Sequence, residues 1–276
     1  MPEGPEIRRA ADRIAAVLEA TPLLEAEFTY PRLADWGPRF SGHHVTRVQA
    51  RGKAMLLHID SGHVVYSHNQ LYGKWVTRKT HTLPKTKRSL RIRLLTERGA
   101  ALLYSASDID VWDAERIDEH PFLARLGPDV LDEATDTRRI SAVLRSRAFQ
   151  GRALGGLFLD QRCLAGLGNY LRSEILFEAG VHPSARPKDL DAATRRRLCR
   201  AVKEVTVRAY ERAGVTLTSD LAAAHGLDLT RRGTRHHVFA RANKPCLVCG
   251  TPIEKTRVAT RRLYLCPTCQ PKTARG

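Results

Sequence analysis

The stretch Leu154-Gly-Gly-Leu-Phe-Leu-Asp-Gln-Arg-Cys-Leu-Ala-Gly-Leu-Gly-Asn-Tyr170 decides the fold of the C-terminal half of the chain. Its apolar spacing predicts one helix over Leu154–Cys163 and a second over Tyr170–Ala179, separated by the turn Gly166-Leu-Gly-Asn169. The second helix would present free backbone N–H groups and a positive dipole end, where a phosphate can bind with Asn169 donating beside them. The same residues also fit a tight corner between helices, in which Asn169 is a local cap.

The N-terminal part begins as a helix and continues as strands. Apolar residues recur at helical spacing from Ile7 to Leu18, and Thr21-Pro22 ends the pattern. From residue 23 to about residue 104 the chain has short alternating apolar runs, such as Ala54–Ile59, separated by Gly, Pro and Asp. Several strands at this spacing indicate a β-sandwich or a barrel.

The charge balance points to a polyanionic partner. The chain has 276 residues, with 46 Lys and Arg against 29 Asp and Glu, which gives a net charge of +17. Nucleic acid is the simplest partner for such an excess, and an anionic membrane surface is the weaker alternative. Hydrophobic residues make up 42% of the chain, which excludes intrinsic disorder as a class.

The sequence also predicts where the protein works. No apolar run approaches the roughly 18 residues that a membrane span needs. The start, Met1-Pro-Glu-Gly-Pro-Glu6, contains acidic residues and no apolar segment, unlike a secretory signal. We therefore expect a cytoplasmic protein without membrane association, bound to the nucleoid if the source is bacterial.

Four of the six cysteines form a metal-binding pattern. Two CxxC pairs, Cys246/Cys249 and Cys266/Cys269, lie sixteen residues apart, which predicts a closed tetrahedral site for one structural zinc ion. The segment between the pairs alternates like a two-stranded ribbon and carries Arg257, Arg261 and Arg262 near its tip. A metal-pinned basic ribbon is suited to contacting phosphates. Cys163 and Cys199 lie in helical patterns and are expected to be ordinary buried residues.

The N-terminus offers a nucleophile. Removal of Met1, which is common before a small residue, would leave Pro2 with a terminal amine whose pKa is near 8, well below that of lysine. Such an amine can attack a sugar carbon and form a Schiff base, and Glu3 is placed to move protons beside it. Without further information, the same residues are a simple lead into the first helix.

A set of motifs resembles the formamidopyrimidine-DNA glycosylase/endonuclease VIII family. The matching stretches occur in the family's order and span nearly the whole chain: Met1–Ile7, Arg51-Gly-Lys53, Asp160-Gln161, Ala165–Tyr170 and the four-cysteine finger. The endonuclease VIII branch is the closer match, because position 4 is Gly and because Tyr66–Gly73 and Leu103–Asp108 also look like that branch.

The resemblance implies an α+β fold. An N-terminal β-sandwich with a leading helix would be followed by a helix-two-turn-helix domain and a four-cysteine zinc-finger β-hairpin. The expected division of the chain is a catalytic sandwich domain at 1–126, a linker at 127–136, a helix-two-turn-helix domain at 137–230, and a zinc finger with tail at 231–276.

The resemblance also implies a bifunctional DNA glycosylase and abasic-site lyase that excises oxidised pyrimidines in base excision repair. Pro2 would form a Schiff base with C1′ of the damaged nucleoside, and Glu3 would assist sugar-ring opening. Successive β- and δ-elimination would then cleave the strand. Lys53 would hold a phosphate at the lesion and donate a proton. The expected partner is damaged double-stranded DNA, bound by a monomer.

Three further elements of the family's DNA contacts fall on matching residues. Asn169 and Arg261 would grip the same phosphate as Lys53, although Arg262 directly follows Arg261 and a swap of roles is open. The triplet Gln70-Leu71-Tyr72 matches the family's intercalating loop, which fills the gap left by an extruded base. The local alternative is a β-turn whose Leu71 and Tyr72 pack inside.

Three other functions compete with this one, and one of them, a ribosomal or RNA-binding use of a similar helical motif, leaves the Pro2-Glu3 start unexplained. The first is a glycosylase for oxidised purines such as formamidopyrimidines or 8-oxoguanine, against which Gly4 and the triplet at 70–72 argue. The second is a catalytically silent DNA-binding module, for which the helical motif and the zinc finger would suffice. The presence of Pro2, Glu3 and Lys53 argues against it.

Overall fold

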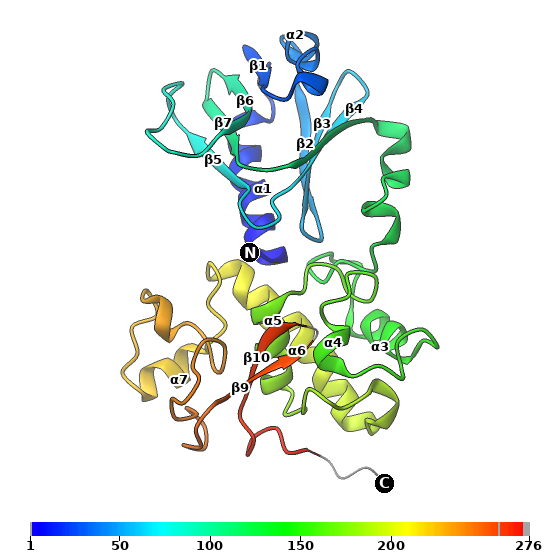
Figure 1. The fold of residues 1–276 in the computed structure, drawn as a ribbon, viewed down its shortest axis with the longest axis vertical. Helices are drawn as coiled ribbons and strands as arrows, with labels where there is room; N and C mark the ends of the chain where they lie inside the picture. The colour runs from blue at the N-terminus through cyan, green and yellow to red at the C-terminus, as the bar shows by residue number, and fades with distance from the viewer. Residues whose placement is uncertain (1, 259, 273–276) are drawn as a thin grey trace. The chain divides into compact units, whose positions relative to one another are not determined.

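The protein folds into two compact units, described here from a computed structural model over residues 2–258 and 260–272. The first unit comprises Met1–Pro2 and Glu6–Arg125, and the second comprises Glu3–Pro5 and Leu126–Gly276 (Figure 1). Residues Glu3–Pro5 therefore belong to the second unit, although they begin the first helix. Among the described residues, no helix has both the length and the apolar character needed to cross a membrane.

The first unit is a β-sandwich with a helix packed into its core. Its two antiparallel sheets have the strand orders β1-β6-β7-β5 and β2-β3-β4-β8. The strands are β1 (Glu25–Phe28), β2 (Val45–Arg51), β3 (Ala54–Ile59), β4 (His63–His68), β5 (Lys74–Arg78), β6 (Leu90–Thr96), β7 (Gly99–Tyr104) and β8 (Asp108–Asp113). The helices are α1 (Gly4–Leu18) and α2 (Trp36–Phe40), with short 3-10 turns at Pro31–Leu33, Ala114–Glu119 and Leu123–Arg125.

One hydrophobic core holds this unit together. Alternate residues of β3, among them Leu57, point into it, and so do Leu94 of β6 and Ile14 of α1. Because both sheets and the helix contribute to the same core, the predicted sandwich with its leading helix is confirmed. The strand region was predicted to end near residue 104, but it extends to Asp113. The last strand, β8, pairs with β4 over its whole length.

The second unit is helical and ends in a β-hairpin. Its helices are α3 (Thr137–Arg145), α4 (Leu154–Leu157), α5 (Asn169–Glu178), α6 (Ala192–Glu211) and α7 (Ser219–Ala224), with 3-10 turns at Pro187–Asp189 and Arg232–Thr234. The hairpin consists of β9 (Glu254–Val258) and β10 (Arg261–Leu265). Leu171, Ile175 and Leu198 pack with Leu263 of β10 in one core, so the hairpin is joined to the helices by apolar contact. Cys163 and Cys199 are buried, as predicted.

The helix predicted over Leu154–Cys163 was wrong in length, because only Leu154–Leu157 is helical. Two glycines weaken the helix, and the side chains that follow bond to the backbone instead of leaving it to the helix. Asp160 accepts a hydrogen bond from the Arg162 N–H at 3.0 Å. Gln161 accepts from the Gly166 N–H at 3.1 Å and donates to the Leu167 carbonyl at 2.9 Å. The helix is thereby replaced by a fixed turn that delivers the chain to α5.

A buried carboxylate on α5 holds the segment that leads into the zinc finger. Glu174 is fully buried and accepts backbone N–H hydrogen bonds from His237, Val238 and Phe239 at 2.8–2.9 Å. The Thr216 hydroxyl donates to it at 2.6 Å. Burial alone raises the pKa of a carboxyl, but the hydrogen bonds with His237 and Thr216 outweigh this and lower the pKa of Glu174. The ionised side chain therefore acts as a clamp on residues 237–239.

The variant Glu174→Gln should unfold more easily, because an amide replaces one acceptor oxygen with a donor that faces backbone N–H groups. We expect a loss on the order of 3 kcal/mol in the free energy of unfolding at neutral pH. Because the folded-state pKa is lowered, this advantage of the wild type is complete above the ordinary glutamate pKa of about 4.3 and declines as the pH falls below it. Urea titrations across this range would measure it.

Glu204 is the matched control, because it is exposed on α6 and its change to Gln removes the same charge. Glu204→Gln should stay close to the wild type at every pH. A stability gap for Glu174→Gln that widens on acidification would contradict an ionised clamp.

Candidate active site

The carboxylate of Glu3 is bound by the start of helix α5. The backbone N–H of Tyr170 donates to Glu3 Oε1 at 2.8 Å, and that of Leu171 donates to Oε2 at 3.3 Å. Glu3 is only 3% exposed, so these contacts are shielded from water. The positive end of a helix dipole favours a negative charge at this position. Glu3 is thus a fixed, buried anion immediately after Pro2 in the chain.

Two glycines make room for Glu3. The Gly4 N–H donates to the Gly166 carbonyl at 2.8 Å, and Gly166 has a φ of +93°, a conformation that favours glycine. A Cβ added at Gly168 would lie 2.6 Å from Glu3 Oε1. The glycines that the sequence indicated as phosphate-binding therefore let an acidic side chain approach. Glu3 occupies the N–H groups of Tyr170 and Leu171, so these two do not bind a phosphate, and nearby side chains are the further donors to consider.

Such side chains surround a cavity of ≈ 490 Å³ at the zinc-finger hairpin. Its lining residues are Asn169, Phe239, Ala240, Arg257, Thr260, Arg261, Arg262 and Tyr264. The structure thus brings Asn169 together with both Arg261 and Arg262, so the question of which arginine acts stays open. Among the described residues, three guanidinium groups and no carboxylate line the cavity, which suits a phosphate.

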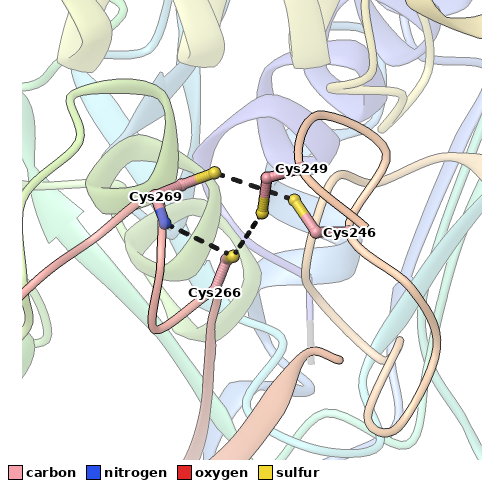
Figure 2. Close-up of side chains that lie close together, drawn as sticks. All are labelled: Cys246, Cys249, Cys266 and Cys269. Carbon is pink, nitrogen blue, oxygen red and sulfur yellow. Dashed lines mark hydrogen bonds between the residues drawn. The ribbon is translucent and has the colours of Figure 1, made fainter. Parts of the chain in front are cut away.

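The four cysteines converge as the spacing predicted (Figure 2). Their sulfur atoms all lie within 4.8 Å of one another; Cys246 and Cys269 are 3.9 Å apart, and Cys249 and Cys266 are 3.4 Å apart. A tetrahedral zinc ion with Zn–S bonds near 2.3 Å would place the sulfurs about 3.8 Å apart. The donor set and its size therefore fit one structural zinc ion, held by Cys246, Cys249, Cys266 and Cys269.

Lys53 sits in a tight turn of the sandwich. Arg51 pairs with Ala54, so Gly52 and Lys53 form the two-residue loop between β2 and β3, and Gly52 has a φ of +60°. Lys53 is only 8% exposed. It is therefore a held ammonium group rather than a solvated lysine at the end of a strand.

The triplet at 70–72 forms an exposed loop between β4 and β5. Leu71 is 61% exposed and Tyr72 is 71% exposed, so neither packs inside as the alternative supposed. Gln70 has a φ of +46°, and its Oε1 accepts a hydrogen bond from the Ser107 hydroxyl at 3.0 Å. The Arg88 guanidinium donates to the Tyr72 carbonyl at 2.6 Å. The backbone is held while the two apolar side chains face solvent.

Sequence reasoning missed Arg172, which connects Asn169 to the hairpin. Its guanidinium donates to Asn169 Oδ1 at 2.9 Å and to the Arg262 carbonyl at 3.0 Å. The available signal was an arginine within an otherwise apolar helix face, since its neighbours Leu171 and Ile175 are core residues.

Three known domain families match the chain. The formamidopyrimidine-DNA glycosylase N-terminal domain matches residues 1–107, the helix-two-turn-helix domain of that enzyme matches 126–220, and a zinc finger found in it and in isoleucyl-tRNA synthetase matches 243–272. Endonuclease 8 of Salmonella agona is 44% identical over 270 residues, covering 98% of this chain and 100% of that protein. Endonuclease 8 of Escherichia coli has the same identity and coverage.

The chain belongs to the formamidopyrimidine-DNA glycosylase/endonuclease 8 family. Members of this family are DNA glycosylases with abasic-site lyase activity in base excision repair, and the chain is an enzyme of this class. Its fold is that of a Lactococcus lactis Fpg solved with DNA containing N7-benzyl-Fapy-dG. That comparison has a TM-score of 0.80 and 22% identity, and covers 98% of this chain and 100% of the other.

The variant Gly168→Ala should impair this enzyme, because the added methyl group takes the space of the Glu3 carboxylate. Loss of a positioned acid–base group costs about a hundredfold in rate, and we expect a fall of that order in strand cleavage at an abasic site. The matched control is Gly151→Ala, since nothing lies within 4 Å of a Cβ there. Equal rates for the two variants would contradict the proposed importance of the carboxylate position.

Metal analysis should give one zinc ion per chain. We expect Cys249→Ala to reduce the zinc content and to speed hydrogen exchange of the backbone amides in β9 and β10, because a small hairpin has little core of its own. Cys199→Ala, which removes a buried cysteine outside the cluster, should retain full zinc. Full zinc in Cys249→Ala would exclude the four-thiolate site.

Proposed function

We propose that the enzyme excises oxidised pyrimidines from double-stranded DNA through a Schiff base on Pro2. The observation that carries this proposal is the buried carboxylate of Glu3, which is fixed by the start of α5 directly beside Pro2 in the chain. A fixed acid next to a terminal secondary amine supplies the two groups that this chemistry needs. The 44% identity to proteins named endonuclease 8 supports pyrimidine lesions over purine lesions.

In the proposed reaction the Pro2 nitrogen attacks C1′ of the damaged nucleoside. The bond from C1′ to the base breaks, and the base leaves with the electron pair and takes up a proton. Glu3 accepts the proton that the Pro2 nitrogen loses after the attack and passes it to the ring oxygen of the sugar, so that the ring opens and an iminium ion forms between Pro2 and C1′. The terminal amine acts as a nucleophile because the ordinary pKa of an α-amino group is near 8, which leaves a useful fraction unprotonated at neutral pH.

The iminium ion then allows strand cleavage by two eliminations. Loss of a proton from C2′ breaks the C3′–O bond, and the 3′ phosphate leaves. A second proton loss breaks the C5′–O bond, and the 5′ phosphate leaves. We assign Lys53 to phosphate binding and to proton donation in these steps, since its burial holds the ammonium group in place. Water finally hydrolyses the iminium and releases Pro2.

The remaining assignments concern DNA binding. Asn169 and Arg261 bind a phosphate of the lesion strand in the arginine-lined cavity, and the exposed Leu71 and Tyr72 enter the base stack while Gln70 faces the orphaned base. Bound zinc has a structural role, and no reaction step uses it. We also propose the domain division at 126, 136 and 230, a monomeric enzyme, and action in the cytoplasm.

Borohydride trapping would test the proposal. The full-length enzyme is incubated with a duplex that contains thymine glycol, reduced, and mapped by peptide mass spectrometry. We expect a stable adduct on Pro2 with Met1 removed, no adduct with Pro2 blocked by a retained methionine, and slow trapping with Glu3→Gln. A parallel duplex with 8-oxoguanine should trap poorly.

Other outcomes would change the assignment. Faster trapping on the 8-oxoguanine duplex would move the enzyme to oxidised purines. An adduct on a lysine would remove Pro2 from its role. Duplex binding without trapping on any lesion or abasic duplex would favour the silent DNA-binding module.

A further inference from the structure

Arg172 is a completely buried arginine that joins three parts of the second unit. Its relative exposure is 0%, and it is among the largest fully buried side chains. Nη1 donates to the Gly155 carbonyl of α4 at 2.6 Å. Nη2 donates to Asn169 Oδ1 at 2.9 Å and to the carbonyls of Arg261 and Arg262 at 3.2 and 3.0 Å. A single guanidinium therefore links α4, the first residue of α5 and the start of β10.

Burying the charged guanidinium of Arg172 costs folding free energy. Burial lowers the pKa of Arg172 to about 10, so the group is still charged at neutral pH. All four hydrogen-bond acceptors are neutral oxygens, Nε has no partner, and the attraction of the Glu3 carboxylate, which raises the pKa, does not offset the burial. A well-packed apolar side chain of similar size commonly stabilises a core as well as a buried ion does. Stability alone therefore does not account for an arginine here.

The contact with Asn169 fixes the orientation of its amide. A guanidinium only donates hydrogen bonds, so it selects the amide oxygen and leaves the amide nitrogen as the group that Asn169 can offer to another ligand. Asn169 lines the same cavity as Arg261 and Arg262. With its oxygen occupied, Asn169 contributes donors to a cavity that otherwise presents guanidinium groups.

The contacts with the hairpin fix the backbone from which the cavity arginines project. The carbonyls of Arg261 and Arg262 belong to the first two residues of β10, next to Thr260, which has a φ of +63°. Their side chains are exposed, so at these two residues the strand is tied to α5 by main-chain contacts with Arg172, next to the apolar packing of Leu263. The buried guanidinium of Arg172 thus holds both Asn169 and the start of β10, which lie on two sides of the cavity.

We propose that Arg172 is a positioning residue that sets the Asn169 amide and the Arg261 backbone to bind one phosphate of the lesion strand. The proposal rests on the proposed function of Asn169 and Arg261. It predicts that loss of Arg172 removes the contact with that phosphate even though Arg172 itself is shielded from DNA.

The test combines protein variants with neutral phosphate substitutions. Duplexes carry a tetrahydrofuran abasic analogue, and each phosphate near it is replaced in turn by an uncharged methylphosphonate. The affinity of the zinc-loaded full-length enzyme is measured for every duplex. At the phosphate that Asn169 and Arg261 bind, the wild type should lose roughly tenfold in affinity, the loss expected for a charged hydrogen bond.

Arg172→Met should bind the unmodified duplex roughly tenfold more weakly and be nearly insensitive to the substitution at that one position. Its sensitivity at other positions should remain that of the wild type. Arg208→Met is the matched control, because Arg208 is a partly buried arginine of the same unit that pairs with Glu178 instead of the cavity. It should show the wild-type pattern even if it is less stable.

The outcomes separate the two proposals. If Asn169→Ala and Arg261→Ala leave the sensitivity to every phosphate unchanged, the proposed phosphate contact itself fails. If Asn169→Ala and Arg261→Ala abolish the sensitivity to substitution at one phosphate while Arg172→Met retains that sensitivity, only the role of Arg172 is overturned. Should Arg172→Met fail to fold or to bind zinc, Arg172→Gln decides. The glutamine side chain is shorter and uncharged, so it cannot hold the Gly155 carbonyl, the Asn169 amide and the two hairpin carbonyls together, and full wild-type sensitivity in this variant would overturn the proposal.

Discussion

The hydrogen bonds from the start of α5 to Glu3 are the constraint on which the second unit's chemistry depends. They join residues 167 and 168 positions apart in the sequence. The glycine turn before α5 exists to admit this carboxylate, since a side chain at Gly168 would collide with it. A helix N-terminus that could have bound a phosphate is used to hold an acid, and the proposed phosphate contact is assigned to the side chains around the hairpin cavity.

Helix α5 carries three more polar side chains into the interior. Glu174 faces the segment before the zinc finger, Arg172 faces the hairpin, and the Ser173 hydroxyl accepts the Tyr264 N–H at 3.3 Å. Each bonds to backbone groups of another segment, so the helix organises the main chain around it. The apolar side chains of α5 supply the packing energy, whereas these polar ones select which register the hairpin takes.

Local patterns were sufficient to predict the large features of the molecule. The period-two runs predicted a sandwich or a barrel, and the two CxxC pairs predicted the zinc cluster, because both depend on spacing within a short segment. The helix at Leu154 failed because Asp160 and Gln161 bond to nearby backbone groups, which hydrophobic spacing does not report. Local patterns also could not predict that Glu3 binds the N-terminus of α5, because Glu3 is distant in sequence. A resemblance suggested which residues act, but not that Glu3 occupies these N–H groups.

The zinc-finger hairpin shows why such long-range polar contacts are needed. At one end, the four thiolates can be fixed by a metal ion, and Gln270 connects that end to the Val181 carbonyl at 2.9 Å. At the other end, the basic tip has no core of its own and its arginines repel one another. An apolar anchor would hold the tip without defining its rotation, whereas a guanidinium that bonds to two successive carbonyls fixes both its position and its twist. The buried charge of Arg172 thus lowers stability but gives a defined orientation to the residues that we propose to bind DNA.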